Sequence, residues 1–338
     1  MASGRMEFYS NSIMQHTNLS FVLPNDVFGP DIRDKRHYAR PTKSLILLHG
    51  LMGTDTDWLY VGVAQEMAAR YNLAIFMPAA GNSFYLDRGY AGGNWASFVG
   101  EELPAYIRKT FGFCQSREDT LVGGLSMGGF GALHTALRYP EIFSRCFALS
   151  PALCLHEVAE TGERRSSPMS KGMVRDVFGD PGTLLGSEKD PEFLYRSGKA
   201  AGKAMPRIYM AIGTEDGLYG VNQDFRRFLA GQGADFRYEE GPGAHTWSFW
   251  NAYIDRALAW LLQDDGQEAA AEQEPETGKK LSEMTERELF CVLTGDRDVL
   301  RQARLQEMIL AYRKKHPESV GTGVVDLTAI VAEMSAEE

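Results

Sequence analysis

Residues 124–128 read Gly-Leu-Ser-Met-Gly and place one hydroxyl, that of Ser126, between two glycines. An apolar run precedes the pentapeptide, and a run with helical periodicity follows it. This Gly-x-Ser-x-Gly pattern predicts a nucleophile elbow, a strained strand-to-helix turn that lifts the serine hydroxyl away from the sheet. Side chains at Gly124 and Gly128 would collide where the strand and the helix pass closely. A serine presented in this way can attack a carbonyl carbon.

A serine nucleophile needs a base to take its proton and an acid to orient that base, and candidates for both follow along the chain. Asp216 ends the strand-like run 206–216, and Glu215 beside it is the alternative acid. His245 lies in a glycine-rich loop after the next strand-like run. Because the order serine, aspartate, histidine accompanies nucleophile elbows, Ser126, Asp216 and His245 are the predicted catalytic residues.

A carbonyl attacked by serine also needs two N–H groups that hold its developing negative charge. Met127, the residue after the serine, offers one of them. The second is expected from the loop 47–54, where the N–H of Leu51 is the predicted donor and that of Met52 is the alternative. His49 in this loop is interpreted as a core histidine that shapes the backbone.

A rigid sheet is needed to hold these residues in place, and the sequence has the pattern of a fold with a central sheet. Short apolar runs alternate with stretches of helical periodicity, which is typical of an α/β fold with a mostly parallel central sheet and helices on both faces. We give the first five residues no structural role. The strand-like runs are 43–50, 72–81, 119–126, 143–151, 206–216 and one that begins near 234, with antiparallel edge strands expected within 7–24.

The alternation predicts one catalytic domain, residues 1–263, interrupted by a long insert at 152–205. An insert of this length is typically a lid or cap. Residues 264–280 are polar and acidic, which predicts a linker. Residues 281–338 show helical periodicity and predict a small helical C-terminal appendage. Its apolar stripe must pack against the same molecule or against a partner. The sequence therefore leaves open whether the protein forms a homo-oligomer.

Composition narrows the classes of function. The 338 residues carry a net charge of −10 and no basic block, which argues against nucleic-acid and membrane partners. The sequence shows neither a secretory signal nor a membrane span. Its four cysteines are widely spaced and show no disulfide pattern, which favours a cytoplasmic protein. Two of them, Cys114 and Cys291, are expected to be partly exposed. Phosphate-binding glycine loops and metal-binding histidine spacings are missing, so no cofactor and no metal are expected.

Longer blocks around these residues resemble the esterase D-like branch of the α/β-hydrolases, and most of all the tributyrin esterases. The resemblance covers roughly residues 6–263 and implies an α/β-hydrolase fold. It also implies the roles given above for Ser126, Asp216, His245, Leu51 and Met127. The blocks that carry it are 47–59, 77–107, 124–144, 213–219 and 241–250.

Four large aromatic residues flank the predicted catalytic segments and are the predicted substrate-binding residues: Trp58, Tyr90, Trp95 and Trp247. Tyr90 and Trp95 lie in a glycine-rich stretch whose composition is unlike that of a core. An aromatic-lined cleft suits small acyl groups or a phenolic ring.

The catalytic residues predict a serine carboxylesterase that forms an acyl-enzyme. The resemblance implies that its substrates are short-chain acyl esters, of the acetyl or butyryl type, or feruloyl esters. Its expected partner is a small ester. The same residues would serve an acyltransferase or a thioesterase resembling S-formylglutathione hydrolase, and these are the alternatives. A non-catalytic binding module would be expected to lack one of the three catalytic residues, and all three are present.

Overall fold

The computed structural model describes residues 1–28, 35–164 and 167–263. Within them, eight strands form one mixed sheet in the order β1-β2-β4-β3-β5-β6-β7-β8. The pairs β1–β2 and β2–β4 are antiparallel, and the remaining pairs are parallel, so the predicted α/β fold is confirmed. The strands are β1 (Ala2–Ser10), β2 (Gln15–Leu23), β3 (Lys43–Leu48), β4 (Leu73–Pro78), β5 (Thr120–Leu125), β6 (Arg145–Leu149), β7 (Arg207–Gly213) and β8 (Phe236–Gly241).

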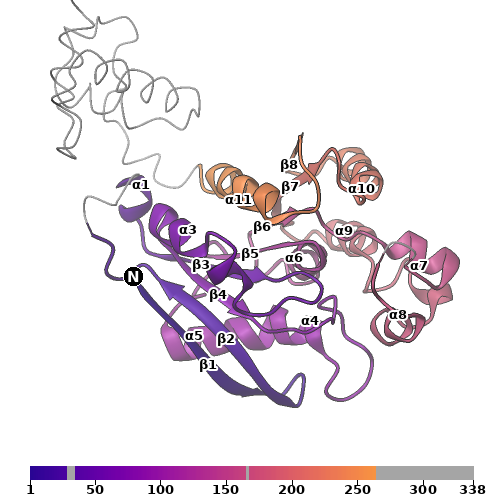
Figure 1. Cartoon of the computed structure of the whole chain (residues 1–338), viewed down its shortest axis with the longest axis horizontal. Coiled ribbons are helices and arrows are strands. Elements are labelled where there is room, and N and C mark those ends of the chain that lie inside the picture. Colours follow the sequence, from indigo (N-terminus) through magenta and orange to yellow (C-terminus); the bar gives the residue numbers. More distant parts are fainter. Residues whose placement is uncertain (29–34, 165–166, 264–338) are drawn as a thin grey trace, which may run out of the picture. The chain divides into compact units, whose positions relative to one another are not determined.

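Helices cover both faces of the sheet (Figure 1). α3 and α11 pack on one face, whereas α5, α6, α9 and α10 contribute to the core on the other. The π-helical segment η2 joins α4 to α5. The helices are α1 (Lys35–Tyr38), α2 (Asp57–Tyr60), α3 (Ala64–Tyr71), α4 (Trp95–Ser97), η2 (Phe98–Glu102), α5 (Leu103–Phe111), α6 (Met127–Arg138), α7 (Leu155–Thr161), α8 (Lys171–Phe178), η3 (Pro181–Thr183), α9 (Pro191–Ala200), α10 (Tyr219–Gln232) and α11 (Trp247–Leu261).

The strand β3 shows why the central strands appear in the sequence as unbroken apolar runs. All of its residues are buried, because helices cover the sheet on both sides. Successive side chains of a strand point to opposite faces. Ile46 and Leu48 therefore join the core under α5 and α6, whereas Leu45 and Leu47 join the core under α3 and α11.

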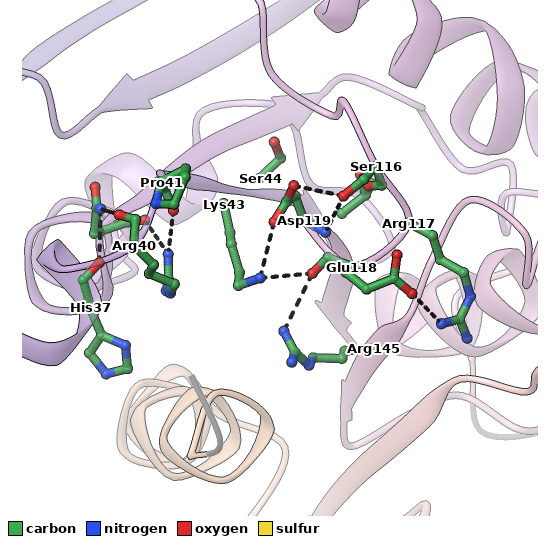
Figure 2. Close-up of polar contacts among 12 residues, drawn as sticks. His37, Arg40, Pro41, Lys43, Ser44, Ser116, Arg117, Glu118, Asp119 and Arg145 are labelled. Atoms are coloured by element: carbon green, nitrogen blue, oxygen red, sulfur yellow. Dashed lines mark hydrogen bonds and ion pairs between the residues drawn. The ribbon is translucent and has the colours of Figure 1, made fainter. Parts of the chain in front are cut away.

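Charged side chains link the amino-terminal ends of β3, β5 and β6 (Figure 2). Lys43 Nζ donates to the backbone oxygen of Glu118 at 3.0 Å and pairs with the Asp119 carboxylate at 3.1 Å. Arg145, the first residue of β6, donates to the same Glu118 oxygen at 3.5 Å. Because these strands are parallel, their carboxyl ends lie together at the opposite end of the strands, which we call the carboxyl edge of the sheet. Ser126 directly follows β5 and therefore lies at the carboxyl edge.

Two expectations about the described residues are wrong. The first five residues have a structural role, because β1 begins at Ala2 and Arg5 forms hydrogen bonds of 2.7 and 3.1 Å to Asp55. Cys114, expected to be partly exposed, is buried in the core, where its N–H donates to Ser44 Oγ at 2.8 Å.

The predicted insert contains α7, α8, η3 and α9, which lie between β6 and β7. The predicted linker 264–280, the predicted appendage 281–338 and Cys291 lie outside the described residues. Across residues 1–28, 35–164 and 167–263, no helix combines the length and the apolar character that a bilayer crossing requires.

Candidate active site

Ser126 lies in the turn between β5 and α6 with φ of 55° and ψ of −118°. Positive φ is costly for a residue with a side chain, so the surrounding backbone must hold this turn in place. Its N–H donates to Leu149 O at 2.8 Å, and its own carbonyl accepts from the N–H of Ala152 at 3.0 Å. A Cβ on Gly124 would lie 2.5 Å from the carbonyl oxygen of Gly128, which explains why a glycine stands two residues before the serine.

The structure brings Ser126, His245 and Asp216 together in one hydrogen-bonded chain. His245 Nε2 lies 2.9 Å from Ser126 Oγ, and His245 Nδ1 lies 2.8 Å from Asp216 Oδ2. Ser126 follows β5, Asp216 follows β7, and His245 follows β8, so the carboxyl edge of the sheet positions all three. An imidazole held between a hydroxyl and a carboxylate is the arrangement that activates a serine for attack.

The electrostatics of Asp216 suit a partner for a protonated histidine. Burial acts to raise the pKa of Asp216, but hydrogen bonds from His245 and from the N–H of Leu218 outweigh it and hold that pKa below its usual value. Asp216 is therefore a carboxylate at neutral pH. Glu215, the alternative acid, is exposed and instead accepts a hydrogen bond from the N–H of Gly243.

His49 fixes the loop that follows β3. Its Nε2 accepts the N–H of Ala80 at 3.0 Å, so the ring proton lies on Nδ1, which donates to Gly50 O at 2.7 Å. Burial lowers the pKa of His49, so the ring is neutral at neutral pH and keeps both hydrogen bonds. The structure therefore places His49 as expected, in the core beneath the loop.

Leu51 and Met127 both line the cavity that contains Ser126. Met127 is the first residue of α6, and the first N–H groups of a helix have no partner within it. The N–H of Met52 donates to Asn82 Oδ1 at 2.7 Å and is therefore already bound. Leu51 remains as the donor expected opposite Met127.

Asp55 holds the far end of this loop against the antiparallel strands. Its side chain is fully buried and accepts hydrogen bonds from Arg5, from Ser20 Oγ at 2.7 Å and from Thr54 Oγ1 at 2.9 Å. Burial acts to raise the pKa of Asp55, but these hydrogen bonds outweigh it and lower that pKa. β1 and β2 thus fix the position of the loop that carries Leu51.

A cavity of about 540 Å³ contains Ser126 and His245. This volume is typical of sites for small molecules. The Trp250 and His245 rings are nearly perpendicular, with 4.9 Å between their centroids, and the Trp250 indole N–H donates to Ser150 Oγ at 3.1 Å. The apolar residues that line the cavity are Leu51, Met52, Phe84, Leu125, Met127, Ala152, Pro168, Leu218, Val221, Trp247 and Trp250.

Of the four aromatic residues predicted to bind substrate, the structure places Trp247 alone on this cavity. Trp58 is buried in the core, where its indole N–H donates to Leu48 O. Trp95 is also buried in the core. Tyr90 is half exposed, and its hydroxyl contacts Asp176 of α8 at 3.3 Å. Trp58, Trp95 and Tyr90 are therefore not among the residues that line this cavity.

The insert contributes lining residues that the sequence analysis missed, among them Cys154, Glu157 and Arg164. Burial raises the pKa of Cys154 to about 11, although Arg164 acts to lower it. Cys154 therefore stays a thiol at neutral pH and is a poor nucleophile there. No local sequence signal marked Glu157 or Arg164, because charged residues in a polar stretch usually face solvent.

Comparisons with known proteins agree with this geometry. The sequence profile of a family described as "Putative esterase" matches residues 10–261. An acetyl esterase from Caldicellulosiruptor saccharolyticus is 40% identical over 263 residues, which cover 77% of this chain and 98% of that protein. An S-formylglutathione hydrolase from Paracoccus denitrificans is 31% identical over 141 residues, 35% of this chain and 48% of that protein.

Two solved structures from Staphylococcus aureus have a similar fold. The fluorophosphonate-binding serine hydrolase F superposes with a TM-score of 0.67 at 28% identity and covers 78% of this chain and 99% of its own. An S-formylglutathione hydrolase superposes with a TM-score of 0.66 at 26% identity and covers 77% and 98%. The family match spans most of the sequence and includes the hydrogen-bonded serine, histidine and aspartate. The chain thus belongs to the putative esterase family of α/β-hydrolases and is a carboxylic ester hydrolase.

Proposed function

We propose that the protein hydrolyses short-chain acyl esters, acetyl esters foremost, through an acyl-enzyme formed on Ser126. The observation that carries the mechanism is the chain of hydrogen bonds from Ser126 through His245 to Asp216. The preference for a short acyl group is supported by the acetyl esterase that is 40% identical over nearly its whole length.

In the first half of the proposed reaction, Ser126 Oγ attacks the ester carbonyl and His245 Nε2 takes its proton. Asp216 holds the proton of Nδ1 and balances the positive charge that forms on the ring. The N–H groups of Leu51 and Met127 hold the oxygen of the tetrahedral intermediate. His245 then returns its proton to the leaving alcohol as the carbon–oxygen bond breaks.

In the second half, a water molecule takes the place of the alcohol. His245 Nε2 removes a proton from this water, whose oxygen attacks the acyl-enzyme carbonyl. The same two N–H groups hold the second oxyanion. Collapse of this intermediate breaks the bond to Ser126 Oγ, which regains its proton from His245, and releases the carboxylic acid.

A thioesterase activity is the second candidate, favoured by the S-formylglutathione hydrolases among the relatives and the solved structures. A thioester would be attacked by the same serine, and the sulfur would leave as a thiol. A substrate panel separates the two proposals. Higher kcat/KM for acetyl esters than for S-formylglutathione supports the ester proposal, and the reverse order supports the thioester one.

Replacing Ser126 with alanine tests the mechanism. We expect turnover of p-nitrophenyl acetate and butyrate to fall on the order of 10⁵-fold, because the nucleophile is lost. A fluorophosphonate probe should label the wild type at Ser126 and leave the variant unlabelled. Ser248, an exposed serine of α11, supplies the control, since Ser248→Ala should retain activity and labelling. Near-normal turnover by Ser126→Ala would reject the proposal.

A further inference from the structure

Ser150 carries a buried hydroxyl at the carboxyl edge of the sheet, and the proposed mechanism gives it no task. It directly follows β6, which lies between the strand that precedes Ser126 and the strand that precedes Asp216. Ser150 is fully buried, and its backbone has a φ of 46°. Positive φ is costly for a residue with a side chain, and such strain is concentrated at functional sites.

Neighbouring groups fix the position of the Ser150 hydroxyl. The backbone N–H of Ser150 donates to Ala211 O of β7 at 2.7 Å, which joins it to the strand before Asp216. The indole N–H of Trp250 donates to Ser150 Oγ at 3.1 Å. Because Oγ accepts this bond and is buried, its own proton needs a buried acceptor.

The Asp216 carboxylate supplies that acceptor. Asp216 Oδ2 lies 2.8 Å from His245 Nδ1, and Oδ1 accepts the N–H of Leu218 at 2.9 Å. The Ser150 hydroxyl is a further donor to this carboxylate and contributes to the low pKa of Asp216. Each carboxylate oxygen can accept two hydrogen bonds, so the hydroxyl displaces neither of the other donors. The Asp216 side chain is almost completely buried, so these donors hold it in place and keep it charged.

Trp250 connects this hydroxyl to the imidazole as well. Its ring stands nearly perpendicular to that of His245, with 4.9 Å between the centroids, while its N–H is bound to Ser150. The contacts therefore form a closed ring of four side chains, which are His245, Asp216, Ser150 and Trp250. Movement of one of them disturbs the two beside it.

Resting on the proposed function, we propose that Ser150 is a positioning residue that holds the Asp216 carboxylate in line with His245, and that Trp250 anchors its hydroxyl. The positive charge on His245 develops as Ser126 attacks. A carboxylate that is free to rotate would support this charge less well, so the loss should fall on kcat and leave KM nearly unchanged.

Replacing Ser150 with alanine removes the hydroxyl without altering the wall of the cavity, since Ser150 is not among the described residues that line it. We expect kcat for p-nitrophenyl acetate to fall about tenfold or more, because a hydrogen bond to a charged group is lost, while KM stays within about twofold. Labelling of Ser126 by a fluorophosphonate probe should slow as well. Ser144→Ala is the matched control, because Ser144 is a buried serine beside the other end of β6 and its Oγ makes no hydrogen bond within the described part of the chain.

A double substitution separates positioning from general support of the fold. In an Asp216→Asn background, Ser150→Ala should change the residual kcat by less than about twofold, because the carboxylate that the hydroxyl positions is already gone. Trp250→Phe keeps an aromatic ring beside His245 and removes the N–H, so it should lower kcat about threefold or more. Should melting temperatures show that Ser150→Ala is unfolded, Trp250→Phe carries the same comparison in the two backgrounds.

Three outcomes would overturn the inference. An unchanged kcat in a folded Ser150→Ala enzyme would show that the hydroxyl does not position Asp216. An equal loss of kcat in the Asp216→Asn background would show that Ser150 acts on the fold and not through the carboxylate. A higher KM with unchanged kcat would assign Ser150 to substrate binding. A wild type that neither hydrolyses p-nitrophenyl acetate nor reacts with the probe would instead refute the proposed function, and this result precedes any comparison of variants.

Discussion

Replacing Gly128 with alanine should separate two segments that the proposed chemistry requires at a fixed distance. Gly128 is the second residue of α6, and a Cβ there would lie 2.6 Å from His49 O and closer still to Leu48 O. Both oxygens belong to the backbone at the end of β3, so neither can rotate away as a side chain would. The start of α6 and the loop after β3 must therefore move apart.

The size of that movement follows from the contact distance. Cβ atoms rarely approach other atoms within 3.4 Å, so the contact to His49 must lengthen by about 0.8 Å. Met127 lies on the helix side of this contact and Leu51 on the loop side, so the two proposed oxyanion donors separate by a similar amount. A misplacement of this size costs about 100-fold in rate. Overpacking costs about 1–3 kcal/mol of unfolding free energy.

The assay measures kcat with p-nitrophenyl acetate together with the melting temperature. Gly231→Ala is the control, since Gly231 lies in α10 with open space around it and alanine there should stabilise the helix by about 0.5–1 kcal/mol. Gly129→Ala is the intermediate case, because a Cβ at Gly129 would lie 3.1 Å from its nearest neighbours. The kcat values should fall in the order Gly231→Ala, Gly129→Ala, Gly128→Ala.

If the Gly128→Ala enzyme has the kcat and melting temperature of the wild type, then α6 can move to make room for the Cβ at no cost. The argument from the close contact at Gly128 would then be wrong. A lower melting temperature with unchanged kcat would refute the link between this contact and the oxyanion site. In that case the glycine would serve folding alone.

Two further predictions concern titratable groups. Asp216→Asn should lower kcat about 10⁴-fold, because an amide neither fixes the histidine tautomer nor balances its charge; Glu215→Gln is the control, and equal losses would contradict the assignment. Burial lowers the pKa of His134 from 6.5 to about 4. At pH values between about 4 and 6.5, unfolding therefore takes up a proton on this histidine. The free energy of unfolding should fall by up to about 3 kcal/mol as the pH drops through this range. Urea titrations should show a flatter pH dependence for His134→Gln and an unchanged one for the exposed His156→Gln; an unaltered slope in His134→Gln would disprove this source.

The sheet could be predicted from the sequence because its central strands are buried on both faces. The run predicted at 119–126 forms β5 over Thr120–Leu125, and the run at 206–216 forms β7 over Arg207–Gly213. The ends differ by a few residues because apolar side chains continue into the loops. The first part of β1, before Glu7, was not predicted. The contact that holds it, between Arg5 and Asp55, joins residues far apart in the chain and leaves no local sequence signal.

The hydrogen-bonded serine, histidine and aspartate could be predicted because glycines and strand ends mark each of them locally. The choice between Asp216 and Glu215 could not be made in this way. Neighbouring residues at the end of a strand point in different directions, and the turn after β7 decides which carboxylate reaches His245. Only coordinates show that direction.

The aromatic lining was the least predictable part of the site. A tryptophan fills a core as readily as it lines a cavity, and no local pattern distinguishes Trp58 from Trp247. The two rings even touch edge to face, with 5.1 Å between their centroids, although only Trp247 faces the cavity. Arg164 was missed for the opposite reason, since its burial depends on tertiary contacts of the insert, such as the pair with Glu157, that leave no local sequence signal.

The placement of the insert separates two tasks in the chain. The proposed catalytic residues and oxyanion donors come from segments that follow β3, β5, β7 and β8, whereas the lining residues Glu157 and Arg164 come from the segment between β6 and β7. Exchange of the part of this segment that carries Glu157 and Arg164, with Ala152 kept, would change the wall of the cavity and leave the proposed catalytic residues in place. The scaffold is therefore suited to grafting, in evolution or in the laboratory, with one junction on each side of the exchanged piece.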